Sequence, residues 1–303
     1  MNKQIEWPKK TREMQNWGMD STYWNGFKFR DDDIIIATWA KSGTTWMQQI
    51  VAQFVFNGET DNVPVGEISP WVDFRLPPPE KRPDLEAQKH RRFLKTHLPL
   101  DALVFSPKAK YIYIGRDGRD VVWSFHNHHL YSNDVFYDGI KSLPDFGPIL
   151  MQPNPTSDVR QYFLDWLNKD GFPLFPFWEN IRSWWTVRDL PNVHFVHYQN
   201  LKDDMEGEMR RVAAFIGASI DESKWDQMVR HCTFEHMKNN APLSTPLGGA
   251  IFEGGAKVFI NKGTNGRWRD TLTQEDIEAY EARAIAELGP ECAHWLATGE
   301  FLT

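Results

Sequence analysis

The sequence predicts an α/β protein with three layers, in which helices flank a central, mainly parallel sheet. The first observation is the run Ile34–Ala37, whose four apolar residues in a row are typical of a strand covered on both faces. The second is a helical apolar period that begins a few residues later, and the third is a set of later strand candidates. The 303 residues allow two domains, but no linker-like break is visible, so we expect a single domain, 1–303.

The segment after the first strand predicts an anion-binding loop that opens a helix. Trp46, Ile50 and Phe54 recur every fourth residue, as in a helix that packs one side onto a sheet. Backbone N–H groups at a helix N-terminus have no intrahelical partner, so a loop of small residues there can wrap an anion. The loop residues are Lys41, Ser42, Gly43, Thr44 and Thr45.

This loop is P-loop-like, but its spacing differs from the general G-x-x-x-x-G-K-[ST] pattern. Lys41 precedes Gly43, and the first glycine is missing. A shorter loop grips fewer oxygens, so a single terminal phosphate fits better than a triphosphate. The alternative is an ordinary turn between strand and helix, with Lys41 in solvent.

Composition and charge favour a soluble enzyme of small ligands. Hydrophobic residues make up 41% and charged residues 25%, and the formal net charge is −7, which argues against nonspecific nucleic-acid binding. Only Cys232 and Cys292 are present, which indicates a reducing compartment. The N-terminus lacks the apolar core of a signal peptide, and no window reaches the length of a membrane span. We therefore expect a cytoplasmic protein without a membrane partner.

The second strand candidate, Arg92–Thr96, ends in a possible acid–base pair. Lys95 and His97 stand two residues apart, so their side chains share one face of an extended segment. An imidazole can take a proton from an attacking hydroxyl, and a neighbouring ammonium can stabilise the transferred group. The alternative is a structural histidine, which is the commoner role of a lone histidine.

The third candidate, Lys110–Ile114, repeats the pattern of strand, loop and helix. Arg116 follows the strand and could hold a phosphate, and Ser124 lies one helical turn beyond Asp120. The alternative is a surface ion-pair cluster of Arg116 with its charged neighbours. The three histidines at 126, 128 and 129 match no familiar zinc motif, so no metal is predicted.

The remaining chain predicts two insertions and a fourth strand. Residues 131–176 and 239–257 show little regular period and are expected to form a lid or an acceptor pocket, although a surface flap is equally allowed. Strand 193–197 is followed by Tyr198. The expected helices in this part are 177–189, one capped by Asp203 or Asp204 and stopped at Gly217, 223–230, and Gln274–Leu288 with a Thr273/Asp276 capping box.

The four strands converge on one predicted site. Each is followed closely by a polar group: the Lys41 loop, Lys95 with His97, Arg116, and Tyr198. In open parallel α/β sheets, ligands bind beyond the carboxyl ends of the strands. We therefore expect these groups to surround a single ligand.

These residues resemble motifs of the cytosolic sulfotransferase family, whose sulfuryl donor is 3′-phosphoadenosine 5′-phosphosulfate (PAPS). The chain looks like a bacterial-like member over about residues 20 to 280, with the motifs in the family's order. The matching segments are WAKSGTTW (39–46), KTHLP (95–99), RDGRDVVWS (116–124) and INKGTNGRW (260–268).

The resemblance implies a role for each matching residue. His97 would be the general base, and Lys41 and Lys95 would stabilise charge on the sulfuryl and bridging oxygens, with no metal required. The product would be 3′-phosphoadenosine 5′-phosphate (PAP). Residues implied to hold the nucleotide are Lys41, Ser42, Gly43, Thr44 and Thr45 at the 5′-phosphosulfate, Trp46, Tyr198, Thr233 and Phe234 at the adenine, and Arg116, Ser124, Lys262 and Gly263 at the 3′-phosphate.

Two departures from the family pattern stand out. Asn261 occupies the place of a family arginine, which removes one cation from the 3′-phosphate grip, and Arg267 or Lys257 could replace it. The family's dimer stretch is only partly present, from Arg269 to Glu278, so we expect a monomer or a weak homodimer.

The acceptor is expected to be a small aromatic or hydrophobic alcohol, phenol or amine. Two other functions stay open at this stage. One is a nucleotide-dependent phosphotransferase, which the short loop and the lack of an obvious Mg²⁺-binding aspartate disfavour. The other is a noncatalytic nucleotide-binding regulator of the same fold.

Overall fold

A four-stranded parallel sheet forms the centre of the molecule, as predicted. The computed structural model describes residues 5–144 and 147–302. The strands are β1 (Ile34–Thr38), β2 (Phe93–Thr96), β3 (Lys110–Gly115) and β4 (Val193–His197). Their order is β2-β1-β3-β4, and all three pairings are parallel, with Ile36 opposite Lys95 on one side and Ile112 on the other. The single-domain α/β prediction is confirmed.

Helices cover both faces of the sheet. The α-helices are α1 (Thr44–Val55), α2 (Val65–Ile68), α3 (Gly118–Leu130), α4 (Asp134–Lys141), α5 (Val159–Asn168), α6 (Phe177–Trp185), α7 (Tyr198–Asp203), α8 (Met205–Ile216), α9 (Trp225–His231), α10 (Phe234–Asn239), α11 (Ala241–Ser244), α12 (Ala256–Phe259) and α13 (Gln274–Thr298). Six short 3₁₀ turns join them in the described residues: η1 (Ser21–Trp24), η2 (Pro79–Lys81), η3 (Leu100–Ala102), η4 (Glu222–Lys224), η5 (Pro246–Gly249) and η6 (Arg267–Asp270).

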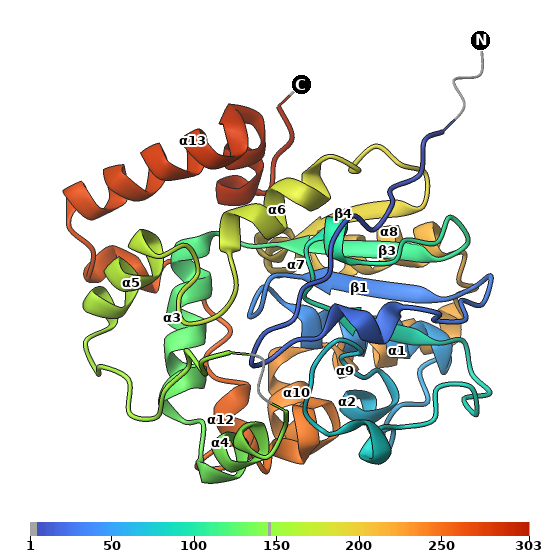
Figure 1. The fold of residues 1–303 in the computed structure, drawn as a ribbon. Coiled ribbons are helices and arrows are strands. Elements are labelled where there is room, and N and C mark those ends of the chain that lie inside the picture. The colour runs from blue at the N-terminus through green and yellow to red at the C-terminus, as the bar shows by residue number, and fades with distance from the viewer. Residues whose placement is uncertain (1–4, 145–146, 303) are drawn as a thin grey trace.

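Two hydrophobic cores lie on opposite sides of the sheet. Ile34 and Ile36 of β1 pack with α1, α8 and α9, whereas Ile35 and Ala37 pack with α3, α6 and α13. Figure 1 shows α6 and α13 on one side of the sheet and α1 and α9 on the other. Alternate residues of a strand point to opposite faces, so a strand buried on both faces needs the unbroken apolar run seen in β1.

The helix boundaries depend on local capping. Asp204 caps α8 by accepting a hydrogen bond from the Gly207 N–H, and Gly217 ends that helix in the left-handed conformation. The predicted capping box of Thr273 and Asp276 is present at α13. The predicted end of α13 at Leu288 is only a break, because Gly289 leaves helical geometry and the helix resumes after it to Thr298.

The first predicted insertion contains more regular structure than its sequence indicated. Helix α4 buries Phe136, Tyr137 and Ile140, and α5 buries Tyr162 and Trp166. Residues 145–146 of this insertion lie outside the described residues. The second insertion, 239–257, is built from α11, η5 and the start of α12.

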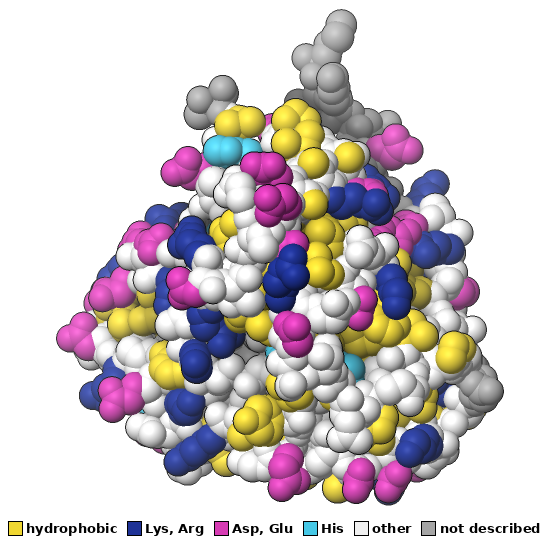
Figure 2. Space-filling view, turned by 90° about the vertical axis from the view of Figure 1, so that its left-hand side faces the viewer, with side chains coloured by type: hydrophobic (Ala, Val, Ile, Leu, Met, Phe, Trp, Pro, Cys, Tyr) yellow, Lys and Arg dark blue, Asp and Glu magenta, His cyan; other side chains and the backbone are white. Residues whose placement is uncertain are grey.

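Acidic and basic side chains are mixed over the outer surface of one side of the molecule. Figure 2 shows this face, where Lys and Arg side chains alternate with Asp and Glu and hydrophobic side chains lie between them. An anion site must therefore be local, as the net charge of −7 already indicated. No helix within residues 5–144 and 147–302 has both the length and the apolar character needed to cross a bilayer.

Candidate active site

The loop from β1 to α1 has the tight geometry expected of an anion-binding turn. Lys41 has a φ of 67° and Gly43 a φ of 115°, and Gly43 is the N-cap residue of α1. A Cβ atom added at Gly43 would lie 2.9 Å from Cδ2 of Tyr198. The glycine is therefore required by both its backbone conformation and the close approach of α7.

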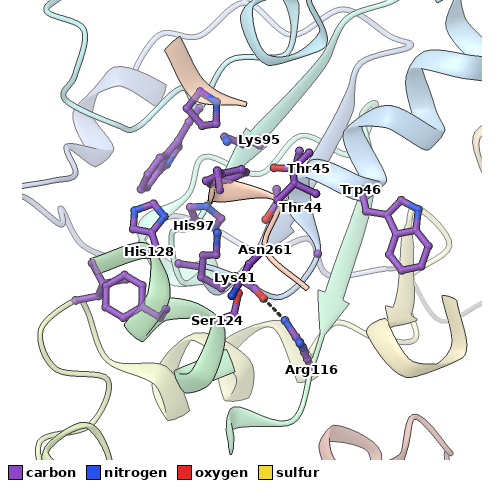
Figure 3. Close-up of a pocket in the computed structure, with 18 of the residues that line it drawn as sticks. Lys41, Thr44, Thr45, Trp46, Lys95, His97, Arg116, Ser124, His128 and Asn261 are labelled. Atoms are coloured by element: carbon purple, nitrogen blue, oxygen red, sulfur yellow. Dashed lines mark hydrogen bonds between the residues drawn. The ribbon is translucent and has the colours of Figure 1, made fainter. Parts of the chain in front are cut away.

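One cavity of about 260 Å³ joins nearly all of the predicted site residues. Figure 3 shows Lys41, Lys95 and His97 around its centre, with Trp46 and Arg116 toward one end. The predicted residues that line it are Lys41, Gly43, Thr44, Thr45, Trp46, Lys95, His97, Arg116, Ser124, Tyr198, Phe234, Lys262 and Gly263. The expectation that the strand ends share one site is consistent with this placement.

Two predicted residues do not line the cavity. Ser42 lies within the loop but is only 2% exposed. Thr233 is the N-cap of α10, where its hydroxyl accepts from the His236 N–H and donates to the Arg230 carbonyl. The positions of these side chains give no direct support to a contact with the ligand.

His97 is held in one tautomer at the end of β2. Its Nδ1 lies 2.7 Å from the Thr38 carbonyl oxygen, which can only accept, so Nδ1 carries the hydrogen. Nε2 therefore holds the lone pair. Burial, followed by the charge of Lys95, lowers the pKa of His97 to about 3, so the ring is neutral near pH 7 and can accept a proton.

Lys95 is buried beside His97 with incomplete charge compensation. Burial lowers its pKa to about 8, and the Asp73 carboxylate opposes that shift. Asp73 itself accepts hydrogen bonds from the indole N–H groups of Trp24 and Trp71. The ammonium is therefore poised to gain from a nearby anion.

Lys41 lies in the loop with no carboxylate partner among the described residues. Its Nζ is 3.8 Å from the centre of the Phe259 ring. Burial lowers its pKa to about 7, and the positive charges of Arg116 and Lys95 lower it further. A bound anion would reverse this shift by stabilising the ammonium.

PAP affinity is predicted to depend on pH through Lys41. Below pH 7 the ammonium is already present, whereas above pH 7 the empty site is neutral and must take up a proton when an anion binds. The association constant should therefore fall about tenfold per pH unit between pH 7 and 8. Calorimetry in two buffers of different ionisation enthalpy measures the proton uptake. A flat affinity with no proton uptake would contradict the prediction, and Lys41→Met should remove the slope.

Arg116 is fixed at the carboxyl end of β3. Its Nη1 donates to the Lys41 carbonyl at 3.0 Å, its Nη2 donates to Asn265 Oδ1 at 2.7 Å, and its guanidinium lies 4.1 Å from the centre of the Tyr198 ring. The ion-pair alternative holds for Arg119, which pairs with Asp117. Arg116 makes no salt bridge in the part of the chain described, so its charge is left for a ligand.

An aromatic shelf borders the opening of the cavity. The Trp46 indole donates to the Cys232 carbonyl at 2.8 Å, which fixes that ring. Phe234 is 42% exposed although it lines the cavity. A Cβ atom at Gly263, whose φ is 63°, would lie 2.7 Å from the Phe234 ring. The shelf therefore needs glycine at this point.

The other end of the cavity is lined by hydrophobic side chains that sequence reasoning did not single out as site residues. Among them are Trp17 and Met19 from the N-terminal segment and Ile251 from the second insertion. Phe136 and Met151 come from the first insertion. The sequence shows no regular period in these segments, and only the tertiary fold brings them together. The cavity thus has a basic end and an apolar end.

The comparisons with known proteins agree with this geometry. A sequence profile described as "Sulfotransferase domain" matches residues 31–288. The chain belongs to the sulfotransferase family. The prediction of a PAPS-dependent sulfotransferase is thereby confirmed at the level of the family and its enzyme class.

Two curated relatives cover most of the sulfotransferase. A "Glycolipid sulfotransferase" of Mycobacterium tuberculosis is 28% identical over 304 residues, which span 92% of each chain. "Sulfotransferase 1A1" of Rattus norvegicus is 31% identical over 260 residues, which span 83% of this chain and 82% of the relative.

Solved structures share the fold. A retinol dehydratase in a complex with retinol and PAP has a TM-score of 0.70 at 24% identity, covering 89% of this chain and 84% of that one. Mouse sulfotransferase SULT7A1 complexed with PAP has a TM-score of 0.66 at 19% identity and covers 91% of both chains. Within the residues described here, no group of three or more His, Cys, Asp or Glu side chains is placed to hold a metal ion.

Proposed function

We propose that this sulfotransferase moves a sulfuryl group from PAPS to a hydroxyl or amine of a small hydrophobic acceptor, with His97 as the general base. The observation that carries the proposal is the fixed imidazole of His97 at the wall of a cavity that also holds Lys41 and Lys95. A neutral base between two buried ammonium groups suits transfer of an anionic group.

In the proposed reaction, each residue acts on a defined atom. His97 Nε2 takes the proton of the acceptor hydroxyl while the acceptor oxygen bonds to sulfur. The bond from sulfur to the bridging oxygen breaks, and the electron pair leaves with PAP. Lys41 stabilises the charge that develops on the bridging oxygen, and Lys95 stabilises the sulfuryl oxygens. The proton on His97 is later released to solvent.

The donor fits the basic end of the cavity. The N-terminus of α1 and the loop 41–45 provide N–H and hydroxyl donors for the 5′-phosphosulfate. Trp46 and Phe234 provide aromatic surfaces for the adenine, and Arg116 with Lys262 provides positive charge for the 3′-phosphate. These assignments are part of the proposal.

Arg267 supplies the cation that Asn261 does not provide. Arg267 lines the cavity, its Nε is buried with no hydrogen-bond partner among the described residues, and the charge of Arg116 together with burial lowers its pKa. A half-buried arginine beside a second arginine needs an anion. Lys257, the alternative replacement, is exposed and does not line the cavity.

Arg267→Gln should therefore weaken PAP more than adenosine 5′-monophosphate, which lacks the 3′-phosphate. Loss of a charge-assisted contact predicts a fall in PAP affinity of about tenfold to hundredfold, with the monophosphate affinity nearly unchanged. Calorimetry with both nucleotides measures this difference. Arg269→Gln is the matched control, because Arg269 is exposed and does not line the cavity. Equal losses for both nucleotides would contradict a 3′-phosphate contact.

The apolar end of the cavity fits a hydrophobic acceptor. Trp71 packs against His97 with ring centres 4.5 Å apart, and Phe175 lies on the same ring at 6.4 Å. An acceptor hydroxyl that reaches Nε2 would therefore bring its carbon skeleton against aromatic surfaces.

The direct test is incubation with PAPS and a mixture of phenols, alcohols and amines, followed by mass spectrometry for sulfated products. We expect sulfated products that form equally well with a chelator present. Turnover that requires Mg²⁺ and a nucleoside triphosphate would favour a phosphotransferase. Tight PAP binding without any transfer would favour a noncatalytic regulator.

The proposed location is the cytoplasm. Cys232 and Cys292 are both free and buried, as expected of thiols kept in a reducing compartment.

A further inference from the structure

His128 is a polar side chain set into the apolar wall of the cavity. It projects from α3, and its ring lies 4.9 Å from Phe252, 5.7 Å from Phe125 and 5.9 Å from Phe259, measured between ring centres. Phe259 is also the ring beneath the ammonium of Lys41. Figure 3 shows His128 near His97 in the same cavity wall.

The imidazole of His128 has no hydrogen-bond partner in the part of the protein that the structure describes. Its Nδ1 is buried and unpaired. This differs from the neighbouring His126 and His129, whose Nε2 atoms lie 2.7 Å and 2.6 Å from the carbonyl oxygens of Thr156 and Gln152. A buried polar group without a partner costs free energy, so the unpaired ring is unexplained by packing alone.

The environment of the ring determines its protonation. Burial and the nearby charge of Lys41 hold the pKa of His128 well below its ordinary value, so the ring is neutral. One nitrogen of a neutral imidazole then carries the hydrogen. An N–H donor is seldom left unpaired in a protein interior, so the hydrogen belongs on Nε2 rather than on the enclosed Nδ1.

We propose that His128 selects acceptors with a second oxygen function, by donating a hydrogen bond from Nε2 to that oxygen while the acceptor hydroxyl to be sulfated meets His97. The inference rests on the proposed function and narrows its acceptor class. The acceptor class is a hydrophobic alcohol or phenol with a further hydroxyl, carbonyl or ether oxygen. A site that hydrogen-bonds one substrate oxygen discriminates against analogues that lack it.

The test compares matched acceptors in wild type and in His128→Phe. The probes are 2-naphthol and the dihydroxynaphthalenes that carry a second hydroxyl at each other ring position. For each pair we measure kcat/KM and take the ratio of the dihydroxy to the monohydroxy compound. Dividing the wild-type ratio by the variant ratio cancels differences in acidity and in the number of reactive hydroxyls.

We expect at least one dihydroxy isomer to lose about tenfold in this ratio in His128→Phe, with 2-naphthol little changed. His128→Asn keeps an N–H donor on a shorter side chain and should retain part of the preference. PAP affinity, measured by calorimetry, should be unaffected in both variants and reports an intact fold.

Equal effects on every acceptor would overturn the role of His128 and leave the proposed function intact. A wild-type protein that sulfates no acceptor would instead remove the proposed function itself. The two failures are therefore distinguishable.

Discussion

His97→Ala is expected to lower kcat by about 10²- to 10⁴-fold, the range for removal of a general base. The reason is that Nε2 is the lone-pair nitrogen of a ring whose Nδ1 is committed to the Thr38 carbonyl. PAP affinity should be unchanged or slightly higher, because removing an imidazole leaves the charges of Lys41 and Arg116 in place. Steady-state kinetics with a sulfated product and calorimetry with PAP measure the two quantities.

The control for His97→Ala is His90→Ala, because His90 does not line the cavity. It should keep wild-type kcat. His97→Gln retains polarity without a titratable nitrogen and should be as inactive as the alanine variant. Wild-type turnover in either His97 variant would show that another group takes the acceptor proton.

Lys41→Met is expected to lower kcat by roughly 10²- to 10³-fold and to weaken the donor as well, because one ammonium serves both steps. In the ground state the ammonium meets the phosphosulfate, and in the transition state it meets the increased charge on the bridging oxygen. Methionine nearly matches the length of the lysine stem and can still pack on Phe259. The loss therefore reports charge rather than packing.

Lys257→Met is the matched control for the Lys41 variant. Lys257 is exposed, lies on α12 and does not line the cavity. Removing it changes the net charge by the same amount, so general electrostatic effects appear in both variants. Equal kinetics of the two variants would contradict a local role for Lys41.

The sheet was predictable because its signals are local. The run Ile34–Ala37 reads as a buried strand on its own, and the structure explains why: alternate residues enter two different cores. The strand order was not predicted, because it depends on which segments pair across long stretches of chain. Helices α4 and α5 were also not predicted, since each is short and its apolar residues follow no long period.

The polar half of the cavity was predictable from topology. The residues after parallel strands meet at one edge of the sheet, which places Lys41, His97, Arg116 and Tyr198 on one cavity wall. The family resemblance then supplied the implied roles. Two of the implied residues, Ser42 and Thr233, have side chains away from the cavity, because one is enclosed in the loop and the other caps α10.

The apolar half was not predictable from the sequence. Trp17 and Phe136 are separated by more than a hundred residues, yet their rings lie 6.3 Å apart at 90° in the same wall. No periodicity links them. His128 and Arg267 were visible as polar residues, but only their burial and lack of partners in the described structure distinguish them from solvated side chains.

A crystal structure with bound PAP tests the central claim most directly. The account predicts the 5′-phosphate within hydrogen-bonding distance of the loop 41–45, the adenine against Trp46 and Phe234, and the 3′-phosphate at Arg116. His97 Nε2 should face the open side of the 5′-phosphate. Nucleotide density elsewhere on the molecule, or a 5′-phosphate out of reach of both Lys41 and His97, would contradict the account.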